Sequence, residues 1–328
     1  MSRPYPACPP THRGVPTIAL EGWHAPVLSA HADTVISEAF VMQAARAARL
    51  LHTAVFDALV DFATDPGPTG ALLLRTVDVG HLPPTPESPA AAARCGKDFT
   101  SEFALLTVAR ALGQPVGYLP EHGGDIVQNI VPVQSSQSRQ VSTSSRVELM
   151  FHTEAAFHPH RPRYLLLLCL RGDPTAATTL SSIREVLPSL DAATIEVLFQ
   201  PRFRTRPDES YRTKPGVTGQ LGSPMSVLSG HRDSPSLVFD ADLMVGIDQA
   251  ADDALRALGQ AVAAHHTSVV LEPGDLLVID NTVAVHGRSP FAPRFDGTDR
   301  WLQRAFVVAD LMPSAADRVG RIIATRFD

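Results

Sequence analysis

A run of seven consecutive apolar residues, YLLLLCL at 164–170, is the strongest constraint on how this chain can fold. A strand with one face in water alternates apolar and polar residues, and this run does not alternate. We therefore expect a central strand that other parts of the chain cover on both faces. Seven residues are also far too few to cross a bilayer, for which a helix needs about 20.

Four segments have the apolar spacing that is typical of helices. Asp33 is a plausible N-cap for the first, the second stops at Gly113, and Pro188 divides the third into two parts. The predicted helices cover residues 33–60, 98–112, 178–198 and 248–265.

Most of the remaining chain is strand-like. The C-terminal segments 268–291 and 299–311 predict a tight β-meander. Residues 134–146 are polar and expected to be flexible. Residues 202–236, which are rich in arginine, proline and glycine, predict an irregular loop or lid. The other predicted strands are 70–80, 125–133, 147–154, 163–172 and 236–244.

The order of these elements predicts one α+β domain over residues 1–328. A helical part at about 30–115 comes first, and a β-rich body with helical insertions follows at about 120–310. No linker-like segment separates the two parts.

Composition and charge exclude several classes of protein. The net charge is −6, so no basic footprint for nucleic acid is present. The prolines of the first twenty residues break the apolar core that a signal peptide needs. Cys8, Cys95 and Cys169 form no zinc-binding pattern and no disulfide framework. We expect a cytoplasmic protein that binds neither nucleic acid nor membrane.

Two potential metal ligands stand immediately ahead of the apolar run. On an extended strand His152 and Glu154 project from the same face, since alternate residues point the same way. A third ligand has to come from elsewhere in the chain, and His286 follows a late strand-like segment. Two histidines and one carboxylate on one face of an octahedron leave open positions, as in the non-haem Fe(II) oxygenases.

Two arginines follow His286 on another strand-like segment. By alternation Arg300 and Arg304 project from one face of RWLQRAFVV. An arginine there could bind the carboxylate of a 2-oxo acid in two parallel hydrogen bonds. The alternative is that both arginines are solvated or pair with Asp296 and Asp299.

Three segments together resemble the clavaminate synthase-like family of Fe(II)/2-oxoglutarate oxygenases, which includes bacterial asparagine, arginine and lysine hydroxylases. The segments are DIVQNIVPV, FHTEAAFHPHRPRYLLLLCLRGDP and NTVAVHGRSPFAPRFDGTDRWLQR, and the resemblance covers most of residues 100–310. It implies a double-stranded β-helix (jelly-roll) core with flanking helices. It also implies Fe(II), 2-oxoglutarate and O2 as the reaction partners, and a free amino acid as the small-molecule substrate.

The same resemblance assigns roles to individual residues. His152, Glu154 and His286 would bind iron, and Arg300 would bind the distal carboxylate of 2-oxoglutarate. Arg304 would hold the α-carboxylate of the amino acid. Gln128 and Glu154 would reach its α-amino group. Since halogenating relatives lack the carboxylate ligand, Glu154 also indicates a hydroxylase.

The side chain of the substrate is a separate question. Asp240 and Asp242 share a face of the strand predicted at 236–244. In the arginine hydroxylases of the family, two acidic residues in a similar stretch engage the guanidinium. The pair therefore favours a basic or urea-bearing amino acid such as arginine, lysine or citrulline, and a place in natural-product biosynthesis. A pair of structural aspartates, with asparagine or a carrier-bound amino acid as the substrate, is the alternative.

Two histidines near the predicted iron ligands need no part in the chemistry. His158 and His160 lie in FHPHRPR, which reads as a turn between strands, and we expect them to be structural. Two other classes of protein remain open. One is a metal-dependent jelly-roll enzyme that does not use O2, and the other is a non-enzymatic amino-acid sensor.

Overall fold

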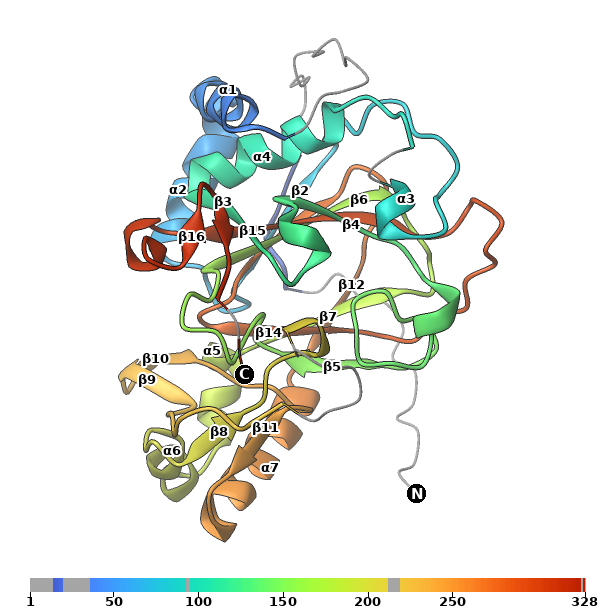
Figure 1. Ribbon diagram of the computed structural model, residues 1–328. Coiled ribbons are helices and arrows are strands. Elements are labelled where there is room, and N and C mark those ends of the chain that lie inside the picture. Colours follow the sequence, from blue (N-terminus) through green and yellow to red (C-terminus); the bar gives the residue numbers. More distant parts are fainter. Residues whose placement is uncertain (1–13, 20–35, 93–94, 212–218, 326, 328) are drawn as a thin grey trace.

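Two β-sheets pack against each other at the centre of the protein, and helices cover the outer face of the larger one (Figure 1). The structure is a computed structural model that describes residues 14–19, 36–92, 95–211, 219–325 and 327. The predicted α+β class is confirmed. No helix within these ranges is long and apolar enough to cross a membrane.

The larger sheet contains the apolar run of the sequence as its central strand. This strand, β6, pairs antiparallel with β13 on one side and β15 on the other, and it is buried from Tyr164 to Leu170, as predicted. In spatial order the sheet consists of β1 Thr17–Ala19, β2 Ala71–Arg75, β13 Leu276–Asp280, β6 Tyr164–Arg171, β15 Trp301–Val308, β3 Gln114–Tyr118, β17 Ile322–Ile323 and β16 Arg318–Val319, with β4 Val127–Ile130 also paired to β15.

The smaller sheet has four strands in the order β12 Thr267–Val270, β7 Ala177–Ser182, β14 Ala284–Arg288 and β5 Leu149–His152. The C-terminal strands β12 to β15 therefore alternate between the two sheets. The β-meander predicted there is wrong, because no two consecutive strands among these four pair with each other. Local pattern identified the strands, and packing of both sheets around one core decided their partners.

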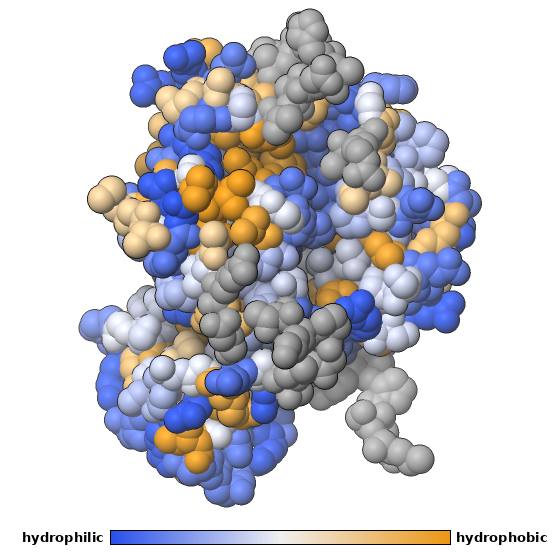
Figure 2. Space-filling view, viewed as in Figure 1, coloured by the Kyte–Doolittle hydropathy of each residue, from blue (hydrophilic) through white to orange (hydrophobic). Residues whose placement is uncertain are grey.

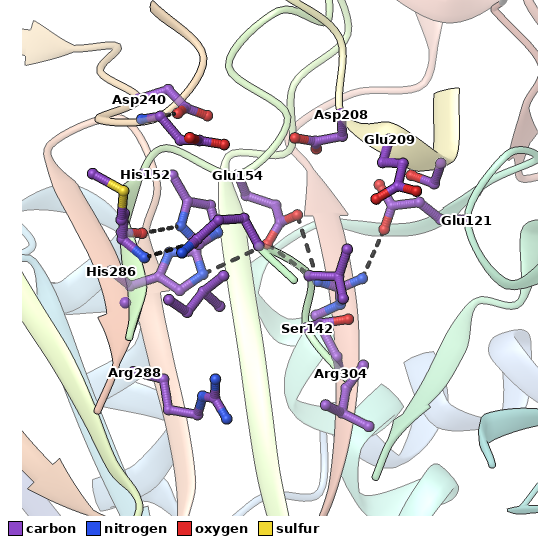
Figure 3. Close-up of a pocket in the computed structure, with 18 of the residues that line it drawn as sticks. Glu121, Ser142, His152, Glu154, Asp208, Glu209, Asp240, His286, Arg288 and Arg304 are labelled. Carbon is purple, nitrogen blue, oxygen red and sulfur yellow. Dashed lines mark hydrogen bonds and ion pairs between the residues drawn. The ribbon is translucent and has the colours of Figure 1, made fainter. Parts of the chain in front are cut away.

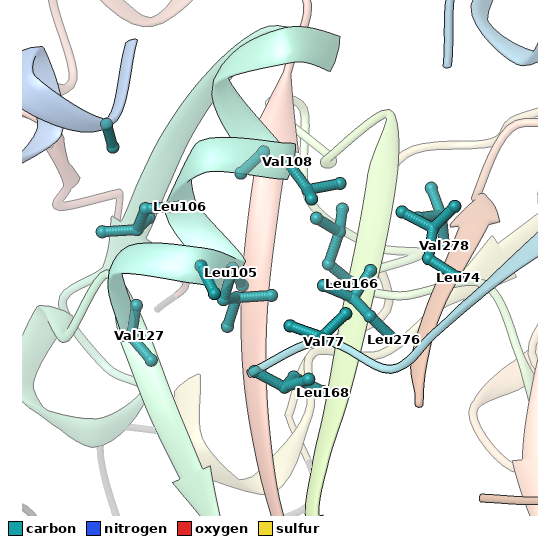
Figure 4. Close-up of a cluster of buried hydrophobic side chains, with 14 of the residues drawn as sticks. Leu74, Val77, Leu105, Leu106, Val108, Val127, Leu166, Leu168, Leu276 and Val278 are labelled. Atoms are coloured by element: carbon teal, nitrogen blue, oxygen red, sulfur yellow. The ribbon is translucent and has the colours of Figure 1, made fainter. Parts of the chain in front are cut away.

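Helix α4 (Thr100–Leu112) lies on the outer face of the larger sheet (Figure 4). Its Leu105 and Val108 belong to the same buried cluster as Leu166 and Leu168 of β6. The leucines that alternate with these, such as Leu165 and Leu167, face the smaller sheet instead. Each fully buried leucine stabilises the fold by about 1.5–3 kcal/mol, so the run holds both layers together. The helix predicted at 98–112, with its end at Gly113, is confirmed.

The single helix predicted at 33–60 is two helices, α1 (Glu38–Ala48) and α2 (Thr53–Thr64). Asp33 lies outside the described residues, and the side chain of Ser37 caps α1 by accepting from the Phe40 N–H at 3.3 Å. His52 caps α2 in the same way through its Nδ1. The chain turns between the helices so that both pack against α4. The apolar spacing alone does not reveal this turn.

The helix predicted at 178–198 begins too early. Residues Ala177–Ser182 form strand β7, and only then follow α5 (Ile183–Val186), a 3-10 turn that contains Pro188, and α6 (Ala192–Leu198). Strand β7 pairs on both sides, with β12 and with β14. Its threonine-rich sequence suits a strand, and this pairing overrides the helical apolar spacing.

The segments predicted as a lid and a following strand are also organised differently. Three short strands begin within residues 202–236, β8 Phe203–Thr205, β9 Leu228–His231 and β10 Ser234–Leu237, while residues 212–218 lie outside the description. The strand predicted at 236–244 is broken by a turn at 241–243 and resumes as β11 (Met244–Gly246). These strands join α5, α6 and α7 (Gln249–Ala264) around a third apolar cluster. Hydrophilic side chains cover most of this lobe on the face in Figure 2.

Candidate metal and amino-acid site

A pocket opens along one end of the two sheets and collects side chains from both. Its walls come from β5, β7 and β14 of the smaller sheet, from β4, β6 and β15 of the larger one, and from several loops. These loops contribute residues 121–122, 140–142, 208–210, 240 and 242–243. All three predicted metal ligands and both predicted arginines line this pocket.

The three predicted metal ligands lie together. One ligand atom from each of His152, Glu154 and His286 lies within 4.8 Å of the other two (Figure 3). His152 ends β5 and faces His286 of β14 directly in the antiparallel register, with ring centroids 4.2 Å apart. Strand pairing thus aligns two ligands that are 134 positions apart in the sequence.

Glu154 reaches the group by a different route from the one predicted. Strand β5 ends at His152, and Glu154 begins a turn, so strand alternation does not orient it. Buried Asn281 holds it instead. The Glu154 N–H donates to Asn281 Oδ1 at 2.8 Å, and Asn281 Nδ2 donates to the Glu154 carbonyl at 3.1 Å. The ligand's backbone is therefore fixed by a residue 127 positions away.

The donor set fits a first-row transition metal. His152 Nδ1 lies 2.8 Å from the Met150 carbonyl, which leaves Nε2 for a ligand. Burial, with the charges of His152 and Arg304, holds the pKa of His286 well below its usual range, so its imidazole is neutral. His286 Nε2 lies 3.6 Å from Glu154 Oε2, which is too long for a hydrogen bond. Two imidazoles and a carboxylate are ligands that iron accepts.

Arg304 is the centre of a buried charged network (Figure 3). Its Nε donates to Gln128 Oε1 at 2.9 Å, and its Nη2 donates to Glu121 Oε2 at 2.7 Å. Its Nη1 lies 3.4 Å from Glu154 Oε2. Burial opposes the charge, but Glu154 and Glu121 raise the pKa of Arg304 above its ordinary value. Arg304 and Gln128, which were both predicted to bind the amino acid, therefore lie in contact as paired residues of β15 and β4.

Arg300 is buried in the same pocket with little to neutralise it. Within the described part of the chain its hydrogen-bond partner is Thr178 Oγ1, at a long 3.5 Å. Burial lowers the pKa of its guanidinium. The alternative ion pairs are not formed, since Asp296 contacts the side chain of Arg294 and Asp299 accepts from the Arg294 N–H. A buried cation with so few partners is suited to an anionic ligand.

Asp240 and Asp242 both line the pocket but do not share a strand face. Asp240 is buried, and its Oδ1 accepts from the N–H groups of Asp242 and Leu243 at 2.9 and 2.7 Å. It therefore caps the turn that breaks the predicted strand. Asp242 is exposed at the rim. Aspartate favours this turn because its side chain can accept from the backbone two residues later.

Several candidate functional residues were not predicted from the sequence. Glu121 is buried against Arg304 and also accepts from Tyr211 Oη at 2.9 Å. Burial raises its pKa. Asp208 lines the pocket on the loop before Tyr211, and burial, followed by the nearby charges of Asp240 and Glu121, raises its pKa well above normal. Arg288 follows His286 at two positions on β14 and is buried. None of them lies in a local pattern that separates it from an ordinary surface residue.

The two histidines expected to be structural lie outside the pocket lining. His158 is fully buried, and its Nδ1 accepts from the His160 N–H at 2.9 Å. Burial lowers its pKa to about 3, so the ring is neutral. It packs edge-on against Tyr118, at 5.0 Å between ring centroids. His160 lies 2.7 Å from Asp317.

Comparison with known proteins agrees with the fold and identifies the family. Residues 69–306 match the model of the taurine catabolism dioxygenase TauD, TfdA family. The chain is 42% identical to the L-asparagine oxygenase of Streptomyces coelicolor over 264 residues, which are 79% of this chain and 77% of that one. It is 40% identical to the L-lysine 3-hydroxylase of Catenulispora acidiphila over 309 residues, 92% of this chain and 85% of that one.

A solved structure of asparagine oxygenase with Fe(II), 2S,3S-3-hydroxyasparagine and succinate superimposes with a TM-score of 0.83. It is 38% identical, and the match covers 92% of this chain and 93% of the other. The chain therefore belongs to the TauD/TfdA dioxygenase family. The resemblance to amino-acid-hydroxylating oxygenases that the sequence motifs carried is confirmed.

Proposed function

We propose that the protein is an Fe(II)/2-oxoglutarate-dependent hydroxylase of a free L-amino acid, with a basic or urea-bearing side chain favoured. One observation carries the proposal. The Glu154 carboxylate of the metal-binding group also contacts Arg304, a buried guanidinium in the same pocket. A ligand with a carboxylate on Arg304 would lie next to the metal. The asparagine oxygenase and the lysine hydroxylase that the chain resembles act on such molecules.

The architecture of the two sheets can be specified beyond the α+β class. We infer that the two sheets form a double-stranded β-helix, because strands β12 to β15 pass alternately between them. The apolar cluster between the sheets and the one beneath α4 share β2, β6 and β13, which supports a single domain over the whole chain. The segment 202–236 would cover the pocket through Asp208 and Glu209.

In this proposal His152, Glu154 and His286 hold the iron. Iron held there would supply, with 2-oxoglutarate and O2, the oxidising power to hydroxylate an unactivated C–H bond, with 2-oxoglutarate converted to succinate and CO2. The protein's part is to fix the ligands through Met150 and Asn281, to position the substrate and to exclude water.

Arg300 would bind the distal carboxylate of 2-oxoglutarate. It is 7% exposed, and Thr178 stands beside it as a further hydrogen-bond donor. The apolar side chains of Leu167 and Leu302 line the same pocket and suit the methylene groups of such a ligand. A buried guanidinium gains two charge-assisted hydrogen bonds when a carboxylate arrives.

Arg304 would hold the α-carboxylate of the amino acid. Gln128 and Glu121 fix its guanidinium from the side, so it need not reorganise when the substrate binds. The α-amino group would meet Glu154 and Gln128 as predicted, together with Glu121. Of the two polar side-chain atoms of Gln128, only Oε1 can accept from an ammonium group, and it already accepts from Arg304.

The charge of the pocket favours a cationic side chain. Six carboxylates line the pocket against three guanidiniums, and four of the six come from the segments 208–209 and 240–242. These four are Asp208, Glu209, Asp240 and Asp242. Burial, and then repulsion from Asp240 and Glu121, raises the pKa of Asp208, and a substrate cation would offset both effects. Asparagine is the second candidate, because the chain is 42% identical to an L-asparagine oxygenase.

A mass-spectrometric screen with Fe(II), 2-oxoglutarate and air tests the proposal. The substrates are arginine, lysine, citrulline, ornithine and asparagine, with glutamate as the anionic control. Gain of one oxygen by one basic or urea-bearing amino acid, dependent on 2-oxoglutarate, is the expected result. Hydroxylation of asparagine alone would overturn the basic side chain but not the enzyme class.

The rival classes give different results in the same assay. An amino-acid sensor would bind its ligand without forming succinate, and a metal enzyme of another kind would need no 2-oxoglutarate. Failure to bind both iron and 2-oxoglutarate would overturn the oxygenase itself.

A further inference from the structure

The loop between β4 and β5 contributes residues 140–142 to the lining of the pocket; we call its residues 134–147 the strap. It was expected to be flexible, yet it is folded on itself. The Val133 N–H donates to the Thr143 carbonyl at 3.0 Å, and the Arg146 N–H donates to the Gln137 carbonyl at 2.9 Å. These bonds close the base of the strap and leave residues 139–142 as its tip.

One buried side chain fastens the strap to the sheet that carries the metal ligands. Arg288 of β14 is 4% exposed. Its Nη1 donates to the Ser144 carbonyl at 2.5 Å, and its Nη2 donates to Ser144 Oγ at 3.0 Å and to the Val147 carbonyl at 3.1 Å. The guanidinium also lies over the ring of Phe291, 5.0 Å from the centroid. A planar fork that serves three acceptors is a geometry that lysine cannot reproduce.

The tip of the strap lies on the amino-acid side of the pocket. Gln140, Val141 and Ser142 line the same pocket as Arg304. The tip is joined to β5, because Gln140 Oε1 accepts from the Met150 N–H at 3.2 Å. It is joined to the opposite wall by the ion pair between Arg139 and Glu209. The strap thus links β5 to the loop that carries Asp208 and Glu209.

We propose that Arg288 is a positioning residue for the amino-acid substrate: it fixes the strap, and through the strap the wall that faces Arg304. This inference rests on the proposed function for the identity of the ligand. Arg288 contacts the strap with both terminal nitrogens and needs no direct contact with the substrate. Loss of the fork releases the strap but leaves the ligands His152, Glu154 and His286 in place.

The test compares Arg288→Lys and Arg288→Met with Arg146→Lys, a control at an exposed arginine of the same strap. Hydrogen exchange of peptides that cover residues 137–145 is measured on the metal-free proteins. Binding of 2-oxoglutarate to the Fe(II) proteins under nitrogen is followed by its visible absorption. The KM for the amino acid identified in the screen is measured last.

We expect faster exchange in the strap for both Arg288 variants, with exchange in the β6 peptides unchanged, which also reports that the fold is intact. The KM of the amino acid should rise about 10- to 100-fold, as small misplacements of substrate-positioning groups do. The affinity for 2-oxoglutarate should change by less than about threefold, since Arg300 is untouched. The Arg146→Lys control should behave as the wild type.

Two outcomes would overturn the proposal. Unchanged exchange in the strap would show that other bonds hold it. A loss of 2-oxoglutarate affinity larger than the rise in amino-acid KM would make Arg288 a cosubstrate residue. Failure of the proposed function is distinct, because no amino acid would then react with the wild type. The exchange measurement would still test whether Arg288 fixes the strap.

Discussion

Arg304 and Glu154 are in contact: Nη1 of the arginine lies 3.4 Å from Oε2 of the carboxylate. One belongs to β15 of the larger sheet and the other to the turn after β5 of the smaller sheet. The contact therefore joins the two sheets at the pocket. It also joins the group that can bind a metal to the group that can bind a substrate carboxylate. A substitution in the metal-binding group should alter iron binding, and a substitution around Arg304 should alter binding of the amino acid, so the two can be distinguished by binding measurements.

Replacing Glu154 by alanine should remove iron binding. Two imidazoles remain, and the loss of the anionic ligand should weaken iron binding on the order of 100-fold or more. The iron content after anaerobic loading and desalting measures this. Glu148→Ala, an exposed change close by in the chain, is the control and should retain iron. Stoichiometric iron in the Glu154→Ala protein would contradict the assignment of the ligand.

Replacing Arg300 by alanine should act on 2-oxoglutarate alone. Truncating one partner of a buried charge pair costs about 2–5 kcal/mol of binding free energy. The dissociation constant for 2-oxoglutarate under nitrogen should rise accordingly, with iron content unchanged. Arg294→Ala alters an arginine whose side chain is 69% exposed, and it should leave the constant unaltered. Equal affinity in both variants would assign the cosubstrate to another residue.

Glu121→Gln should weaken amino-acid binding without affecting 2-oxoglutarate. The change keeps a hydrogen-bond acceptor for Tyr211 but removes a charge that stabilises Arg304. Breaking such a buried pair costs about 3–5 kcal/mol, which should appear both as a lower melting temperature and as a higher KM for the amino acid. Glu196→Gln at an exposed site is the control. An unchanged KM with a lower melting temperature would make Glu121 purely structural.

Asp208→Asn should change which amino acid is preferred. If Asp208 and the neighbouring pocket carboxylates select a cation, the variant should lose about 10-fold or more of its activity toward the basic substrate. Its activity toward a neutral amino acid of similar length should fall less. The ratio of kcat/KM for the two substrates measures this. An equal loss for both substrates would contradict selection by charge.

The stability of the protein should fall in acid partly through His158. Its pKa in the folded protein is about 3, against about 6.5 when unfolded. The unfolded chain therefore binds the proton first, and folding stability falls as the pH drops from about 6.5 toward about 3, by at most about 1.4 kcal/mol per pH unit for this group. Urea midpoints at about pH 7 and about pH 4.5 should differ less in His158→Asn than in the wild type. An identical difference would contradict the low pKa.

The sequence by itself determined the parts whose signals are local. The run at 164–170 predicted a strand buried on both faces, and the helices at 98–112 and 248–265 followed from apolar spacing and from their ends. His152, Glu154, His286, Arg300, Arg304 and Gln128 could be selected as one set because their motifs resemble a family. A lone histidine or arginine has no such signal.

Tertiary structure decided what depends on partners far away in the chain. Pairing on both sides makes residues 177–182 a strand although their spacing is helical, and packing around a shared core sends β12 to β15 to alternate sheets. Asn281, rather than strand alternation, fixes Glu154. Glu121 and Arg288 acquire their roles only when folding buries them against Arg304 and the strap. A buried charge must find a partner in space, and sequence spacing does not say which one.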